Sequence, residues 1–234
     1  MKDLSNVKAI LFDLDNTLMD FRKMKDSAIE SAAEAMIDAG LPLSKGEAIR
    51  KINAVYKRFG IEYQFPFNQL LKEEMGRVDY KVLAAGVVAY RKVKEIYVSP
   101  YPNVVPTLIE LIHRGYKLGM ISDAPTFQAW TRLAGMALHH YFDFVVSLDD
   151  TGTRKPSGLP FQAAIKKLEL QPEELLMVGD NPGRDIAGAN RLGIPTVLAA
   201  YGCLVDIKYL KGEEEADFVI KDIKELLDLL PKRI

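Results

Sequence analysis

The feature that most constrains the fold is a series of short apolar segments, each of which ends abruptly in polar residues. Residues 7–12 are almost continuously apolar, as expected of a strand that is covered on both faces of a parallel sheet. After residue 100, apolar segments alternate with helical patterns at 104–113, 127–134, 160–168 and 184–192; the apolar segments are 116–121, 142–147, 175–178, 194–198 and 218–220. Residues 148–156 are expected to form a loop, and a helix is expected at the C-terminus. This alternation predicts an α/β fold with a doubly wound, mostly parallel sheet.

A block of helical patterns, from about residue 24 to residue 97, interrupts this alternation after the first strand. Gly40 ends its first segment, and Ser44 with Glu47 forms a capping-box pattern that opens the next one. Two further helical segments are expected at 68–75 and 79–96, and a proline-rich boundary follows. The block is therefore predicted to be a helical insertion into the α/β core.

Composition excludes several classes of function. The chain has 234 residues and a formal net charge of −1, which argues against a surface that binds nucleic acid. A single cysteine, Cys203, cannot form an internal disulfide, and the sequence has no Cys/His cluster for zinc. The N-terminal sequence does not resemble a secretory signal, and apolar runs such as 82–90 are too short to cross a bilayer. We therefore expect a globular, cytoplasmic protein.

Polar side chains follow four of the predicted strands. In a doubly wound sheet, ligands bind beyond the carboxyl ends of the strands, where the strand order switches. The residues expected at this edge are Asp13, Asp15, Ser122, Asp123, Lys155, Asp180 and Asp185. The sequence therefore predicts one polar site, built from distant parts of the chain.

Each of these residues also has an ordinary explanation when it is taken alone. Asp13, Asp15 and Ser122 could cap helices, Lys155 could be a solvated loop lysine, and Asp185 could favour the first turn of a helix. These explanations do not account for the expected position of all these residues at the same edge of the sheet. Their coincidence favours a functional site.

Clustered carboxylates repel one another unless a cation neutralises them. Mg²⁺ prefers oxygen ligands and is often held by one or two carboxylates together with a substrate phosphate. Asp13 and Asp180 are the candidate carboxylate ligands, and a lysine with a serine hydroxyl would suit the remaining phosphate oxygens. The residue types therefore predict phosphoryl transfer.

Four motifs resemble those of the haloacid dehalogenase-like hydrolase superfamily. They are Asp13-Leu14-Asp15-Asn16-Thr17-Leu18, Ser122, Lys155-Pro156, and Gly179-Asp180-Asn181 followed by Asp185. The resemblance covers essentially the whole chain in the same order. It implies a Rossmann-like catalytic core formed by residues 1–20 and 99–234, with a small helical cap domain at 21–98.

The resemblance also implies roles for individual residues. Asp13 would attack phosphorus and form an aspartyl-phosphate, and Asp15 would protonate the leaving group and then accept a proton from water. The cofactor would be Mg²⁺, held by Asp13, by Asp180 and by the backbone carbonyl of Asp15. Asp185 would support the ion either directly or through a water.

The remaining motif residues are expected to bind phosphate. These are Ser122, Asp123, Lys155 and Thr17, of which Thr17 would also steady the first loop. Two departures from the family pattern affect this region: Asp123 and Ala124 follow Ser122 where asparagine is common, and the loop 155–160 is slightly atypical.

The function expected from this resemblance is Mg²⁺-dependent hydrolysis of a small phosphomonoester, similar to that of phosphoglycolate phosphatase. A sugar-phosphate phosphomutase and a non-hydrolytic phosphoacceptor or binding module are the alternatives. A metal-independent 2-haloacid dehalogenase is a third, although Asp15 favours phosphoester chemistry. The expected partner is a small phosphorylated metabolite, not nucleic acid or a membrane, and the protein is expected to be a monomer or a homodimer.

Overall fold

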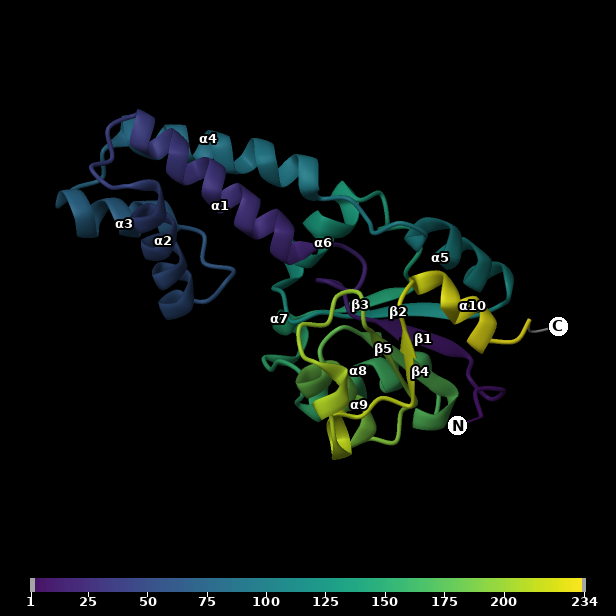
Figure 1. The fold of residues 1–234 in the computed structure, drawn as a ribbon. Helices are drawn as coiled ribbons and strands as arrows, with labels where there is room; N and C mark the ends of the chain where they lie inside the picture. The colour runs from purple at the N-terminus through teal and green to yellow at the C-terminus, as the bar shows by residue number, and fades with distance from the viewer. Residues whose placement is uncertain (1–2, 233–234) are drawn as a thin grey trace. The chain divides into compact units, whose positions relative to one another are not determined.

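The computed structural model describes residues 3–232, which divide into two compact units. The core unit joins the described residues up to Asp20 with those from Ser99 onwards, and the helical unit is Phe21–Val98. Figure 1 shows the sheet with its helices and, separately, the helices of the helical unit.

The core unit is built on a six-stranded parallel sheet with the order β3-β2-β1-β4-β5-β6. Its strands are β1 (Ala9–Phe12), β2 (Lys117–Ile121), β3 (Phe144–Val146), β4 (Leu175–Gly179), β5 (Thr196–Ala199) and β6 (Phe218–Ile220). The chain winds outward from β1 to β3, returns to the centre at β4, and winds outward again in the opposite direction. The predicted α/β fold is confirmed, and its switch point lies between β1 and β4.

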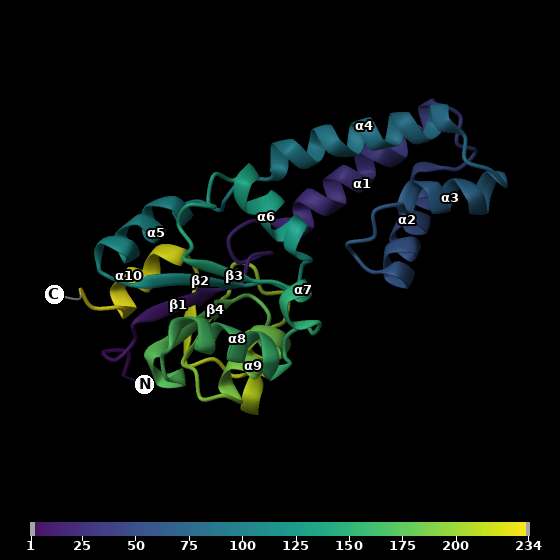
Figure 2. The same cartoon turned by 180° about the vertical axis from the view of Figure 1, so that it is seen from behind.

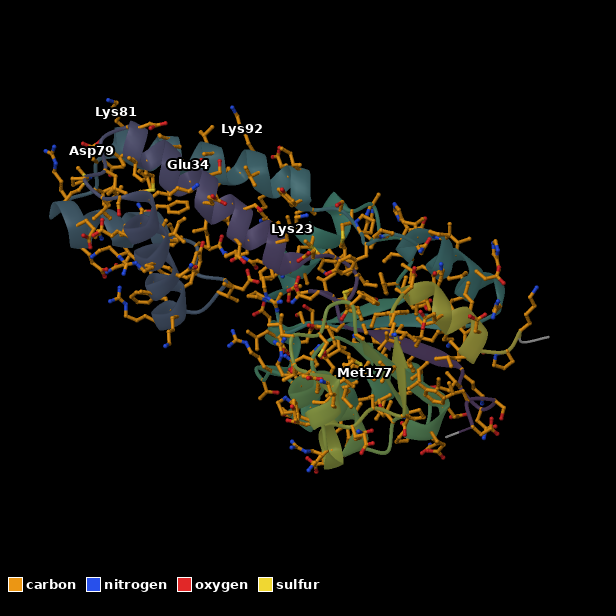
Figure 3. All side chains as sticks on the ribbon, viewed as in Figure 1. Lys23, Glu34, Asp79, Lys81, Lys92 and Met177 are labelled. Atoms are coloured by element: carbon orange, nitrogen blue, oxygen red, sulfur yellow. The ribbon has the colours of Figure 1, made fainter. Side chains whose placement is uncertain are left out.

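Helices cover both faces of this sheet. The α-helices of the core unit are α5 (Val104–His113), α6 (Thr126–Gly135), α7 (Leu148–Thr151), α8 (Gly158–Leu168), α9 (Ala187–Asn190) and α10 (Leu226–Leu229). Helices α5 and α10 lie on one face, and α8 and α9 lie on the other (Figure 2). Phe161 of α8 belongs to the same buried hydrophobic cluster as Leu11 and Met177, and Figure 3 labels Met177 within the sheet. Burial on both faces explains why the central strands are almost continuously apolar.

Two elements differ from the sequence-based expectation. The expected loop 148–156 begins with the short helix α7, because Asp150 accepts hydrogen bonds from the backbone N–H and hydroxyl of Ser147. The expected helix 184–192 is a π-helical turn, Pro182–Ile186, followed by α9. The expected C-terminal helix is present as α10, which has four residues.

The helical unit contains α1 (Phe21–Asp38), α2 (Lys45–Phe59), α3 (Pro66–Met75) and α4 (Tyr80–Tyr97). The apolar faces of these helices form one core that includes Met36, Ile52 and Leu70. The predicted capping box at Ser44 is present, with reciprocal hydrogen bonds between Ser44 and Glu47. The side chains of Lys81 and Lys92 extend from the outside of α4 (Figure 3). Among the described residues, no helix combines the length and the apolar character that crossing a membrane requires.

Candidate active site

The loop after β1 places Asp13 at the carboxyl edge of the sheet, at the switch point. The backbone N–H of Asp13 still donates to the carbonyl of Val178 in β4, at 2.9 Å, so the sheet fixes the position of Asp13. Asn16 then takes a left-handed conformation, with φ of 64°. Asparagine tolerates that conformation better than most residues do, and it lets the chain turn back sharply.

Thr17 lies inside this turn and is fully buried. Its hydroxyl donates to Asp13 Oδ2 at 3.1 Å and lies 3.5 Å from Asp180 Oδ1, while its carbonyl accepts a 2.8 Å hydrogen bond from the hydroxyl of Tyr201. The hydroxyl therefore faces carboxylates, although the sequence had suggested that it would face a phosphate. The hydrogen bond from Thr17 restrains the Asp13 carboxylate.

Lys155 extends from the loop before α8 into the same region and is only 3% exposed. Its ammonium donates to Asp13 Oδ1 at 2.5 Å and to the carbonyl of Ile121 at 2.9 Å, and it lies 2.7 Å from Asp185 Oδ1. Two of its N–H groups thus have hydrogen-bond acceptors, and the Asp185 carboxylate adds a second ion pair. Burial alone would lower the pKa of Lys155, but the carboxylates of Asp13 and Asp185 outweigh it and raise that pKa above its ordinary value. Lys155 is thus a buried cation and not a solvated loop lysine.

Asp180 and Asp185 complete a buried group of acids with Asp13. One carboxylate oxygen from each of the three residues lies within 4.8 Å of the others. Burial and the negative charges of Asp13 and Asp185 raise the pKa of Asp180. Burial likewise raises the pKa of Asp185, against the opposing effect of Lys155. Because three carboxylates face one ammonium, the cluster has a surplus of negative charge that a divalent cation would offset.

The π-helical turn explains how Asp185 reaches this cluster. Asp185 Oδ2 accepts the backbone N–H of Asn181 at 2.9 Å, and its other oxygen lies beside Lys155. The carboxyl group packs so closely against Gly179 that a Cβ at position 179 would lie 2.5 Å from it. Glycine is therefore required at the end of β4, because any side chain there would displace Asp185.

Ser122 and Asp123 follow β2. The buried Ser122 hydroxyl accepts the backbone N–H of Ala124 at 3.2 Å and retains its own hydrogen for donation. Asp123 accepts the backbone N–H of Lys155 at 2.9 Å and pairs with Arg184 at 3.1 Å. A carboxylate repels a phosphate, so the backbone N–H is the group of Asp123 that suits a phosphate oxygen. The side chain of Asp123 instead anchors the loop that carries Lys155.

Asp15 is paired with a residue that sequence reasoning missed. Arg132 Nη1 donates to Asp15 Oδ2 at 2.9 Å. Arg132 lies on α6, where Ala129 and Leu133 share its buried face. An arginine on the apolar face of a helix was the available signal. Arg184, the partner of Asp123, was also missed, because nothing in the sequence distinguishes it from a solvated arginine.

The structure thus brings all eight predicted site residues to one edge of the core unit. Asp13, Asp180, Asp185 and Lys155 form its buried centre, and Asp15 lies beside it with Arg132. Carboxylates beside a buried ammonium are groups that could carry out a covalent phosphoryl transfer.

Comparisons with known proteins agree with this geometry. A sequence model of the family described as haloacid dehalogenase-like hydrolase matches residues 10–199. A protein of Methanopyrus kandleri named glyceraldehyde 3-phosphate phosphatase is 38% identical, with 96% of this chain and 97% of that protein aligned. A protein of the same name from Methanocaldococcus jannaschii is 35% identical, with the same two shares aligned.

A solved structure is also similar. The crystal structure of a HAD phosphatase from Thermococcus onnurineus matches with a TM-score of 0.68 and 26% identity, covering 97% of this chain and 99% of that one. The predicted enzyme class, a phosphatase, is confirmed by the full-length relatives that bear this name. Given a family match over most of its length, the chain belongs to the haloacid dehalogenase-like hydrolases.

Proposed function

We propose that this protein is a Mg²⁺-dependent phosphatase that hydrolyses a small phosphomonoester through a phosphorylated Asp13. The observation that carries the proposal is the convergence of Asp13, Asp180 and Asp185 around the ammonium of Lys155. The names of the relatives from Methanopyrus kandleri and Methanocaldococcus jannaschii support a triose phosphate as the substrate, and glyceraldehyde 3-phosphate is the first compound to test.

The reaction has two displacements at phosphorus. In the first, an oxygen of Asp13 bonds to phosphorus while the bond to the ester oxygen breaks, and Asp15 gives its proton to that departing oxygen. In the second, a water oxygen bonds to phosphorus and the bond to Asp13 breaks, while Asp15 takes a proton from the water. The products are an alcohol and inorganic phosphate, and both carboxyl groups return to their starting states.

Other residues prepare Asp13 for this chemistry. Lys155 offsets the charge of the nucleophile and offers positive charge to the phosphoryl oxygens. Thr17 holds the other Asp13 oxygen in place. Ser122 supplies a hydroxyl, and the N–H groups that follow β2 suit the remaining phosphoryl oxygens.

The acid cluster fits Mg²⁺, because it consists of carboxylate oxygens and has a surplus of negative charge. The ion would be held by Asp13, by Asp180 and by the backbone carbonyl of Asp15. Asp185 would support the ion either directly or through a water: its Oδ2 accepts the backbone N–H of Asn181, and its Oδ1 forms an ion pair with Lys155. When bound, Mg²⁺ supplies positive charge that offsets the negative phosphoryl oxygens.

We assign the helical unit the role of a cap that excludes water and selects the substrate. We propose a small phosphorylated metabolite as the partner, with no nucleic acid or membrane. The near-neutral net charge argues against a surface that binds nucleic acid. We propose that the enzyme works in the cytoplasm as a monomer or a homodimer.

A phosphate-release screen with added Mg²⁺ tests this proposal. The panel contains glyceraldehyde 3-phosphate, phosphoglycolate, a hexose phosphate and a 2-haloacid. We expect phosphate release from at least one small phosphomonoester, lost in Asp13→Asn and unchanged in Asp228→Asn, an exposed residue of α10 that serves as the matched control. Chloride release without phosphate release, or transfer of phosphate to a second sugar position, would overturn the proposal.

A further inference from the structure

Arg132 stands out from the other arginines of the described chain. Among residues 3–232 it is the one buried arginine, with 4% of its surface exposed. A buried guanidinium is costly unless charged or polar groups satisfy it. Its position therefore needs a reason beyond the folding of α6, where the neighbouring buried residues Ala129 and Leu133 are apolar.

The partner of Arg132 supplies that reason. Arg132 Nη1 lies 2.9 Å from Asp15 Oδ2, which is the distance of a charge-assisted hydrogen bond. Asp15 itself is more accessible, with 23% of its side chain exposed. Arg132 is therefore anchored in the core unit, and the more accessible Asp15 lies at the sheet edge that carries Asp13.

We propose that Arg132 is a positioning residue that holds the Asp15 carboxyl group in the orientation needed for proton transfer to the leaving group. This inference rests on the function proposed above. A guanidinium keeps its proton at any pH at which the protein works, so Arg132 cannot itself be the acid. Proton transfer requires the acid to lie within hydrogen-bond reach of the departing oxygen, so a mobile Asp15 would be a poorer catalyst.

The inference predicts a dependence on the leaving group. An alkyl phosphate releases a basic alkoxide, which needs the proton from Asp15. A dinitrophenyl phosphate releases a weakly basic phenolate, which needs little or none. We expect Arg132→Met to lower kcat/KM for the alkyl phosphate by about 10²-fold and to leave the value for the dinitrophenyl phosphate within about threefold of wild type. The comparison uses kcat/KM because that quantity reports the steps up to phosphorylation of Asp13 and not the later hydrolysis.

Three further variants separate positioning from a structural role. Asp15→Asn should show the same dependence on the leaving group, and adding Arg132→Met to it should cause almost no further loss, because the two residues act as a unit. Arg132→Lys keeps the charge and should recover part of the alkyl phosphate activity. Arg114→Met is the matched control: Arg114 is also largely buried and pairs with Glu110, but it lies at the end of α5.

The outcomes distinguish the inference from the proposed function. If the wild type hydrolyses neither ester, the proposed function fails. If the wild type hydrolyses both and Arg132→Met loses the same factor on both, or loses nothing, the inference fails while the function stands. If Arg132→Met does not fold, Arg132→Lys carries the same comparison. Arg114→Met should lower stability without any leaving-group dependence.

Discussion

Replacing Lys155 with methionine tests whether its ammonium holds the acid cluster together. Methionine keeps the unbranched stem but removes the charge beside Asp13 and Asp185. All three side chains are at least nine-tenths buried, so solvent screens them little. Breaking a buried pair by removing one partner typically costs about 3–5 kcal/mol, against about 0–1 kcal/mol for an exposed pair. The larger range applies here.

The expected effect on stability is large enough to measure directly. At about 2–4 °C per kcal/mol for domains of this size, the loss corresponds to a fall in Tm of about 6–20 °C in the presence of EDTA. Added Mg²⁺ should recover part of this loss, because the ion offsets the same negative charge. The phosphatase kcat should also fall by about 10²-fold or more, since one preorganised stabilising group has been removed.

Thermal unfolding followed by circular dichroism measures the first effect, and phosphate release measures the second. Lys166→Met, at an exposed position of α8, is the matched control and should change stability by no more than about 0.5 kcal/mol. The double variant with Asp185→Asn should be more stable than the sum of the single changes predicts, because one uncompensated charge is gone. A Tm for Lys155→Met within about 2 °C of wild type would refute this account of Lys155.

Three further predictions address the site. Burial and neighbouring charges raise the pKa of Asp180, so protons compete with Mg²⁺ for its carboxylate. The Mg²⁺ affinity measured by calorimetry should therefore be lower at about pH 6 than at about pH 8, and equal affinities would contradict the assignment of Asp180 as a metal ligand. Gly202→Ala would place a Cβ 1.9 Å from the carbonyl oxygen of Asn16, so thermal unfolding should show that the free energy of unfolding falls by about 1–3 kcal/mol. Gly46→Ala is the tolerated control, because a Cβ at that position meets no atom within 4 Å. Thr17→Val removes the hydroxyl that hydrogen-bonds to Asp13 and should reduce Mg²⁺ affinity or activity about 10–100-fold. Thr17→Ser keeps the hydroxyl and should stay near wild type. Equal values for the two variants would argue against a role of the hydroxyl in orienting Asp13.

Much of the site could be predicted from the sequence because one rule brings its parts together. Asp13 follows β1 and Asp180 follows β4, and parallel strands that flank a switch point deliver their ends to the same place. Lys155 was harder to place, since a lysine before a proline in a loop is usually solvated. Its burial depends on the anchor that Asp123 provides from a different strand end.

The side chains that contact the motif residues could not be predicted from the sequence. Arg132 lies on a helix with no motif, and only the folded structure brings it to Asp15. Thr17 and Asp123 were expected to bind phosphate, but their side chains face Asp13 and Arg184. Those contacts depend on loop geometry, which residue types and spacing do not specify.

The central claim is that a carboxylate oxygen of Asp13 becomes phosphorylated. The most direct test is acid quenching of the enzyme during turnover, followed by peptide mass spectrometry. The account predicts that the peptide containing Asp13 gains the mass of one phosphoryl group, and that this adduct is absent from Asp13→Asn. Steady phosphate release from the wild type with the phosphoryl group on another residue, or undiminished release from Asp13→Asn, would contradict it.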